Sequence, residues 1–125
     1  MKAGRKMVSV LMLTSLSFWV QAEILTVNQV KTLLEDGEIG RAAAIAYIQG
    51  VTDGILAMDS LAHKETGKPY EFCKLHEAYA SGTPEKHPAY QTKRLVSAWE
   101  KNGYPMETLA VDMMLGFLTR QYGCR

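Results

Sequence analysis

The 125-residue chain has little of what builds large or specialised proteins: two cysteines, four prolines, 9% aromatic residues and almost no excess charge of either sign. The net charge is +1, whereas domains that bind nucleic acid concentrate basic residues on one face to displace counterions. A chain of this length suffices for one small domain and is too short for two. The composition therefore excludes most multidomain enzymes and argues against a nucleic-acid-binding protein.

A long hydrophobic run is also lacking. The longest, Met7–Val20, has 14 residues and is interrupted by serine and threonine, whereas a membrane span needs about 20 apolar residues. Three basic residues precede this run, and Val20-Gln21-Ala22 ends it with small or branched residues at the positions that a signal peptidase reads. This pattern predicts a cleaved secretory signal peptide over residues 1–22, with an uncleaved anchor as the alternative. The exported domain, residues 23–125, keeps 11 basic and 13 acidic residues, and we expect no membrane segment in it.

The two cysteines, Cys73 and Cys124, both lie in the exported part. An oxidising compartment favours a disulfide between them, and two cysteines allow only one pairing. The alternatives are free thiols, or a Cys73/His76 pair that binds a metal or acts as a nucleophile, since these residues stand three apart. A zinc site needs three or four ligands, and no further ligand stands at a motif spacing from this pair. We expect the disulfide, and no metal or other cofactor.

Hydrophobic residues recur at steps of three and four along most of the exported domain, and no stretch alternates well enough to predict a strand. Thr26 and Gln29 match a capping box in front of the first predicted helix. The predicted helices cover about residues 27–36, 40–63, 71–80 and 89–101, and a last one opens at Tyr104-Pro105. The sequence therefore predicts an all-α fold, a small bundle of four to five helices stapled by one disulfide.

Two glycines, Gly50 and Gly54, stand inside the longest predicted helix, where each costs about 1 kcal/mol relative to alanine. Either a neighbouring helix approaches closely at this point, or the glycines are simply tolerated. Asp53 between them is the acidic residue most closely surrounded by apolar residues, and local pairing is its expected role. No nucleophile with a base, phosphate-binding loop or carboxylate pair stands at a usable spacing. We therefore expect that the protein is not an enzyme.

Several segments together resemble a known family. They are the helix Ala44–Gly54, the dipeptide Phe72-Cys73, Gln91 before Leu95-Val96, and the terminal Tyr122-Gly123-Cys124. In this combination the chain resembles, over about residues 40–125, the Rap/Tai family of type VI secretion amidase-immunity proteins. It departs from the family pattern at Ala44, where a cysteine is expected, at Lys74 and Gly123, where proline is usual, and in a longer stretch between Cys73 and Gln91. The family's structural helix motif corresponds here to Tyr47, Gly50, Asp53 and Gly54.

The resemblance implies a periplasmic immunity protein, often a homodimer. Such a protein binds a peptidoglycan amidase injected by type VI secretion and occludes its catalytic cleft, which protects against self and sibling intoxication. Steric inhibition requires a preorganised loop, and the connections Lys64–Glu71 and Ser81–Tyr90 are the candidates, with Tyr70 and Tyr90 as aromatic anchors. The effector-binding residues that we expect are Lys64, Glu65, Lys68, Tyr70, Glu71, Glu85, Lys86, His87 and Tyr90.

A periplasmic acid-stress chaperone of the Hde type is the alternative function. Such proteins are likewise small, helical, exported and held by one disulfide. A chaperone of this kind would expose apolar surface near pH ~2–3, because protonated carboxylates leave a strongly positive chain.

Overall fold

The computed structural model describes residues 24–83 and 87–124, and their regular secondary structure is helical throughout. The predicted signal peptide lies outside the described residues, and so do Glu85 and Lys86 of the predicted binding residues. Within the described part, no helix is long and apolar enough to cross a membrane. The elements are α2 (Val27–Glu35), α3 (Gly37–Thr66), α4 (Cys73–Ala80), the 3₁₀ helix η2 (Pro88–Gln91), α5 (Thr92–Lys101) and α6 (Ala110–Gln121). The predicted all-α bundle is confirmed.

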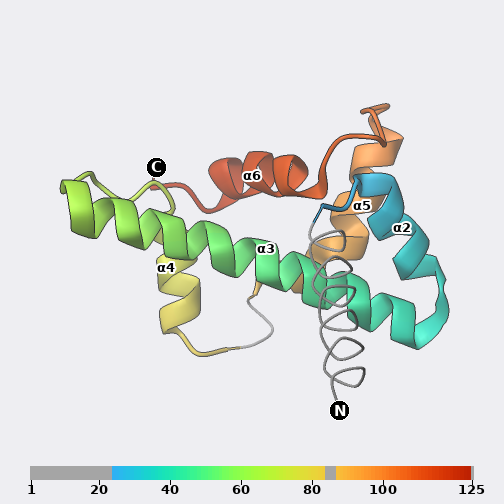
Figure 1. Cartoon of the computed structure of the whole chain (residues 1–125), viewed down its shortest axis with the longest axis horizontal. Helices are drawn as coiled ribbons and strands as arrows, with labels where there is room; N and C mark the ends of the chain where they lie inside the picture. The colour runs from blue at the N-terminus through green and yellow to red at the C-terminus, as the bar shows by residue number, and fades with distance from the viewer. Residues whose placement is uncertain (1–23, 84–86, 125) are drawn as a thin grey trace, which may run out of the picture.

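The 30-residue helix α3 is the spine of the molecule (Figure 1). α6 lies along one side of it, α4 lies on the other side, and α2 and α5 gather at its N-terminal end. The core fills the space between α3 and these elements, with further residues from the segment before α4 and from η2. Its buried hydrophobic members are Val27, Val30, Ala44, Ile48, Phe72, Leu75, Ala89, Val96, Ala110, Met113, Met114, Phe117 and Leu118.

α2 begins with the predicted capping box. The Thr26 hydroxyl accepts the Gln29 N–H at 3.1 Å, and the Gln29 side chain accepts the Thr26 N–H at 2.9 Å. After α2 the chain turns sharply into α3, and the two helices pack closely at Gly40, where a Cβ would lie 2.3 Å from the Leu33 carbonyl oxygen. Glycine is therefore required at position 40.

The last helix begins at Ala110, so the prediction that it opens at Tyr104-Pro105 was wrong. The preceding segment turns and pairs with the start of α2: the Asn28 N–H donates to the Met106 carbonyl at 2.9 Å, and the Val27 N–H donates to that of Thr108 at 2.8 Å. These two N–H groups belong to the first turn of α2, where a helix supplies no partner of its own. Residues 104–109 thus form no helix, and their carbonyl groups accept hydrogen bonds from the first turn of α2.

α3 extends three residues beyond its predicted range of 40–63 at each end. Its C-terminus is set by Gly67, which has a left-handed conformation (φ 69°) that favours glycine, and whose N–H donates to the His63 carbonyl. Lys64 and Glu65 therefore lie in the last turn of α3 and not in the following connection. The predicted helix 89–101 divides into η2 and α5.

The disulfide between Cys73 and Cys124 is confirmed, with a Cα–Cα distance of 4.6 Å across 51 positions of sequence. Cys73 is the first residue of α4, and Cys124 follows α6, so the bond ties the C-terminus to the point where the α3–α4 connection ends. The alternatives of free thiols and a metal-binding or nucleophilic Cys73 are thereby excluded in the oxidised chain.

We predict that the double variant C73S/C124S is much less stable than the oxidised protein. Closing a loop of about 50 residues stabilises a fold by about 4 kcal/mol in the chain-entropy model. Trp99 is the only tryptophan beyond residue 22, and its indole N–H donates to the Pro105 carbonyl at 2.9 Å, so its fluorescence reports unfolding. The urea midpoint followed by Trp99 fluorescence should fall by at least 1 M. An unchanged midpoint would contradict the stabilising role of the disulfide.

Candidate functional site

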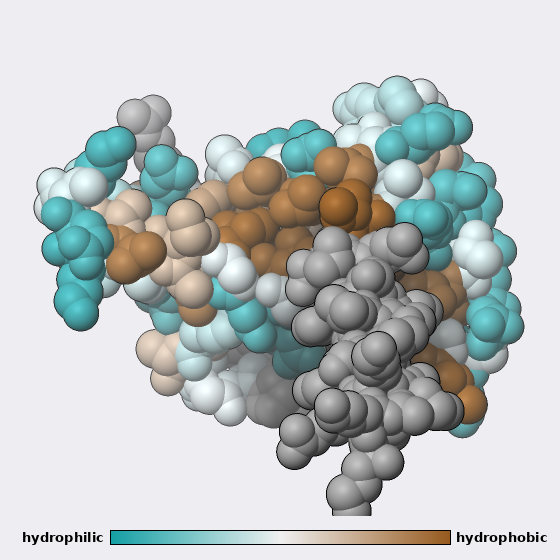
Figure 2. Space-filling view, viewed as in Figure 1, coloured by the Kyte–Doolittle hydropathy of each residue, from teal (hydrophilic) through white to brown (hydrophobic). Residues whose placement is uncertain are grey.

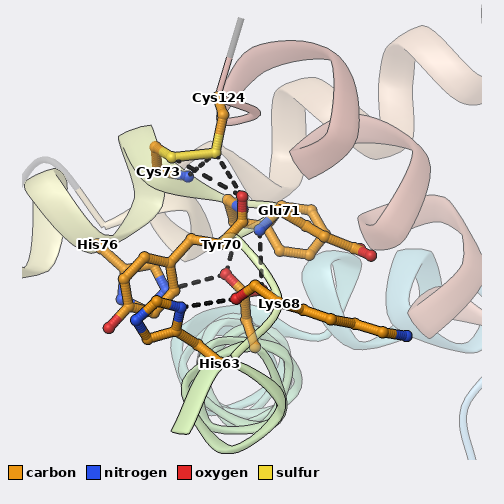
Figure 3. Close-up of polar contacts among 9 residues, drawn as sticks. His63, Lys68, Tyr70, Glu71, Cys73, His76 and Cys124 are labelled. Atoms are coloured by element: carbon orange, nitrogen blue, oxygen red, sulfur yellow. Dashed lines mark hydrogen bonds and ion pairs between the residues drawn. A yellow bond between two sulfur atoms is a disulfide. The ribbon is translucent and has the colours of Figure 1, made fainter. Parts of the chain in front are cut away.

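The connection between α3 and α4, which includes Lys68, Tyr70 and Glu71 (Figure 3), is organised by a buried carboxylate on α3. The Asp59 side chain is only 5% exposed. Its Oδ1 accepts the Glu71 N–H at 2.9 Å, and its Oδ2 accepts the Phe72 N–H at 3.1 Å and lies 2.9 Å from His76 Nε2. One side chain of the spine therefore fixes the last two residues of the connection and the first turns of α4.

Opposing effects act on the ionisation of Asp59. Burial on its own raises the pKa of this carboxyl, whereas the bonds from the Glu71 N–H, the His76 ring and the Phe72 N–H lower it, and together they hold the pKa below its usual value. The lowered pKa means that the folded chain prefers the carboxylate form. Asp59 therefore stabilises the fold above the pKa of the unfolded chain, and this contribution is lost as the pH falls through the lower pKa of the folded state.

Aromatic rings cover the outer side of this connection. The Tyr70 ring stacks on His63 with 4.0 Å between centroids and lies 4.3 Å from the His76 ring on its other side. The ring of His63 also binds the backbone, through a 2.6 Å contact between Nδ1 and the Lys68 carbonyl. The Tyr70 ring thus contacts two imidazoles (Figure 3), and 37% of the residue remains exposed.

The disulfide borders the same connection. The Cys73 N–H faces Cys124 Sγ at 3.2 Å, and the Tyr70 carbonyl lies against the same sulfur. Residues 70–72 are therefore held by α3 through Asp59 and by the C-terminus through Cys124 (Figure 3).

A second polar cluster joins α3, α4 and η2. The Tyr79 hydroxyl donates to Asp53 Oδ1, and His87 Nε2 lies 2.5 Å from that hydroxyl and 3.1 Å from the same carboxylate oxygen. Burial, together with the bond to Asp53 and its charge, raises the pKa of Tyr79, so the hydroxyl remains a donor. On its other edge, His87 Nδ1 accepts the Ala89 N–H at 3.1 Å. Asp53 thus pairs with two distant segments, 26 and 34 residues away in sequence, and not with its neighbours along α3.

Among the described residues, the most buried acid is nevertheless Asp59 and not Asp53, whose side chain is 54% exposed. Asp53 lies on a face of α3 that α4 covers incompletely, although its sequence neighbours are apolar. Asp59 stands four residues after Ile55, at a position of the apolar stripe, and an acid at such a position is the signal that could have identified it.

An apolar groove of about 670 Å³ runs between α3 and α6. In Figure 2 the hydrophobic surface gathers in the middle of the face shown, over these two helices. A Cβ at Gly50 or Gly54 would meet no atom within 4 Å, so of the two alternatives the close approach of a neighbouring helix is excluded here. The groove is lined by Tyr47, Gly50, Val51, Gly54, Ile55, Met58, Asp59, Ala62, Lys68, Pro69, Glu71, Phe72, Val111 and Leu115.

The predicted binding residues fall into two separate groups. Lys64, Glu65, Lys68, Tyr70 and Glu71 lie before α4, at the end of α3 and in the connection that Asp59 holds. His87 and Tyr90 lie after α4, beside a small cavity of about 230 Å³ that Tyr79 also lines. The eight residues of α4, about 12 Å of helix, separate the two connections along the chain. Asp59, His76 and Tyr79, which organise these groups, were not among the predicted site residues.

Across residues 24–83 and 87–124, no three His, Cys, Asp or Glu side chains are placed to hold a metal ion together. Comparison of the chain with protein-family models, with curated proteins and with solved structures gives no match.

We predict that Asp59→Asn destabilises the protein by roughly 2–3 kcal/mol at neutral pH, because the amide has one acceptor oxygen and turns an NH₂ group toward backbone donors. The difference in unfolding free energy between wild type and variant should be full above about pH 4 and shrink as the pH falls further, when Asp59 takes up its proton. Urea unfolding from pH 7 to pH 2.5 measures this difference. The exposed acid Asp112 is the control, and D112N should cost much less. A constant difference at every pH would contradict the ionised role of Asp59.

Proposed function

We propose that this protein is a periplasmic immunity protein that binds a peptidoglycan amidase of type VI secretion and inhibits it sterically, without catalytic activity of its own. One observation carries the proposal: separate parts of the resemblance meet at one place. Tyr47, Gly50 and Gly54 of the helix motif line the same groove as Phe72, and Cys73, next to Phe72, is bonded to the terminal Cys124. The three segments that resemble the family are distant in sequence but lie together in the folded chain.

The rigidity of the connection before α4 supports an inhibitory role. A loop that is already ordered loses less conformational entropy when it docks in a catalytic cleft. Residues 70–72 are fixed by the carboxylate of Asp59 and by the disulfide, and Tyr70 is fixed by two flanking rings. Such a segment presents one shape to a partner.

Tyr90 is the better aromatic anchor of the two. It is 56% exposed, and it stands on η2, whose neighbours Pro88 and Ala89 are buried. Tyr70, in contrast, is 37% exposed, and its ring contacts His63 and His76. Exposed aromatic side chains on a rigid support are typical of the residues that dominate binding energy in protein interfaces. The proposal therefore places the main contact at Tyr90, and it includes the homodimer that the resemblance implies.

We predict that the exported protein binds the small amidase encoded beside its own gene in a stoichiometric complex and blocks its hydrolysis of peptidoglycan. Tyr90→Ala should weaken this binding by at least tenfold, since a hot-spot aromatic contributes about 2 kcal/mol or more. Calorimetry measures both the stoichiometry and the affinity. Tyr104, 48% exposed beside Trp99, is the matched control, and Y104A should bind like wild type. Absence of binding by the wild-type protein would overturn the proposed function.

The lowered pKa of Asp59 is the observation that favours the alternative, an acid-stress chaperone of the Hde type. Protonation of Asp59 would release the Glu71 and Phe72 amides next to the apolar groove, so acid would loosen the surface that such a chaperone exposes. Suppression of client aggregation at pH ~2–3, with no binding to the amidase, would support this alternative in place of the immunity function.

A further inference from the structure

The chain has three histidines, and their rings make different bonds to their surroundings. His63 Nδ1 faces the Lys68 carbonyl, and His76 Nε2 faces the Asp59 carboxylate, so both of these nitrogens carry a hydrogen and donate. A second proton on either ring leaves these bonds in place. His87 differs, because its Nδ1 is an acceptor for the Ala89 N–H.

The bonds of His87 require the neutral ring. With Nδ1 accepting from Ala89, the hydrogen resides on Nε2 and points to the Tyr79 hydroxyl and to Asp53. In the imidazolium form both nitrogens are donors, so Nδ1 would turn an N–H toward the N–H of Ala89. Protonation therefore breaks the bond to Ala89, while the attraction to Asp53 keeps the ring beside α3.

The bond from the Ala89 N–H to His87 Nδ1 caps the start of η2. His87 is the N-cap of η2, Ala89 is fully buried, and the Tyr90 N–H donates to the His87 carbonyl at 3.1 Å. The groups that face the His87 ring are Asp53 from α3, Tyr79 from α4, and the Ala89 amide from η2. The ring itself is 11% exposed, so water replaces the lost partner of Ala89 poorly.

We propose that His87 is an acid-sensitive joint: in its neutral form it caps η2 and orders Tyr90, and its protonation uncaps η2. Histidine is in general the side chain whose charge changes between about pH 5 and pH 8, and this is the range over which the proposal is tested. The link to amidase binding through Tyr90 rests on the proposed function, whereas the joint itself does not.

NMR of the purified exported protein between pH 8 and pH 5 tests the joint without any partner. Long-range ¹H–¹⁵N spectra should show the Nε2–H tautomer of His87 at pH 8. Protection of the Ala89 amide, corrected for intrinsic exchange, should fall at least tenfold in step with the titration of His87. Protection that stays constant while His87 titrates would overturn the proposal.

Two variants separate His87 from the other histidines. In His87→Asn the amide oxygen can cap η2 but does not titrate, so Ala89 should remain protected throughout this pH range. His63→Asn is the matched control and should keep the pH dependence of the wild type. If H87N fails to fold, Asp53→Asn decides: the loss of Ala89 protection should move to lower pH, because the cation loses its nearest negative charge, and an unmoved midpoint would overturn the proposal. If the wild-type protein does not bind the amidase but the protection of Ala89 follows the protonation of His87, the result would count against the proposed function and not against the role of His87.

Discussion

The positions of α4 and of the connection before it depend on the hydrogen bonds that the Asp59 carboxylate accepts. The α3–α4 connection has left-handed Gly67 and then Pro69, and it makes no regular structure. Without the carboxylate, the buried N–H of Phe72 and the partly buried N–H of Glu71 would lose their partner. Asp59 supplies two acceptor oxygens at this point and orients His76 with one of them. The position of Cys73, and thus the closure of the disulfide with Cys124, follows from this arrangement.

The same spine uses a second carboxylate for a second junction. Asp53 and Asp59 each meet a histidine, and in each case the histidine belongs to a segment that must be fixed to α3. The two junctions differ in burial. Asp59 is enclosed and accepts backbone amides directly, so it determines stability, whereas Asp53 is half-exposed and acts through Tyr79 and His87, so its effect is mainly on the order of η2. One helix therefore positions both connections that flank α4.

Local patterns in the sequence predicted the features that depend on neighbouring residues. The capping box at Thr26 and the apolar stripe of α3 follow from spacing along the chain, and the pairing of Cys73 with Cys124 follows from there being only two cysteines. What depends on distant segments was not predictable in this way. Residues 104–109 form no helix because their carbonyls serve the first turn of α2, and Asp59 lies 12 and 13 residues from the amides that it accepts. No periodicity in a single segment encodes such partners.

At the groove over α3, two glycines lower the stability of the helix, and no packing within the chain offsets this loss. Gly50 and Gly54 each weaken the helix by about 1 kcal/mol relative to alanine, and a methyl group at either position would meet no neighbour. Met58 and Leu115 leave apolar surface exposed at the edge of the same groove. Filling the groove with larger residues of α3 would bury this surface and would stabilise the isolated chain. The open groove is therefore a feature that the stability of one chain does not explain. Gly50 and Gly54, the two residues that weaken α3, line this groove and belong to the helix motif that forms one part of the resemblance.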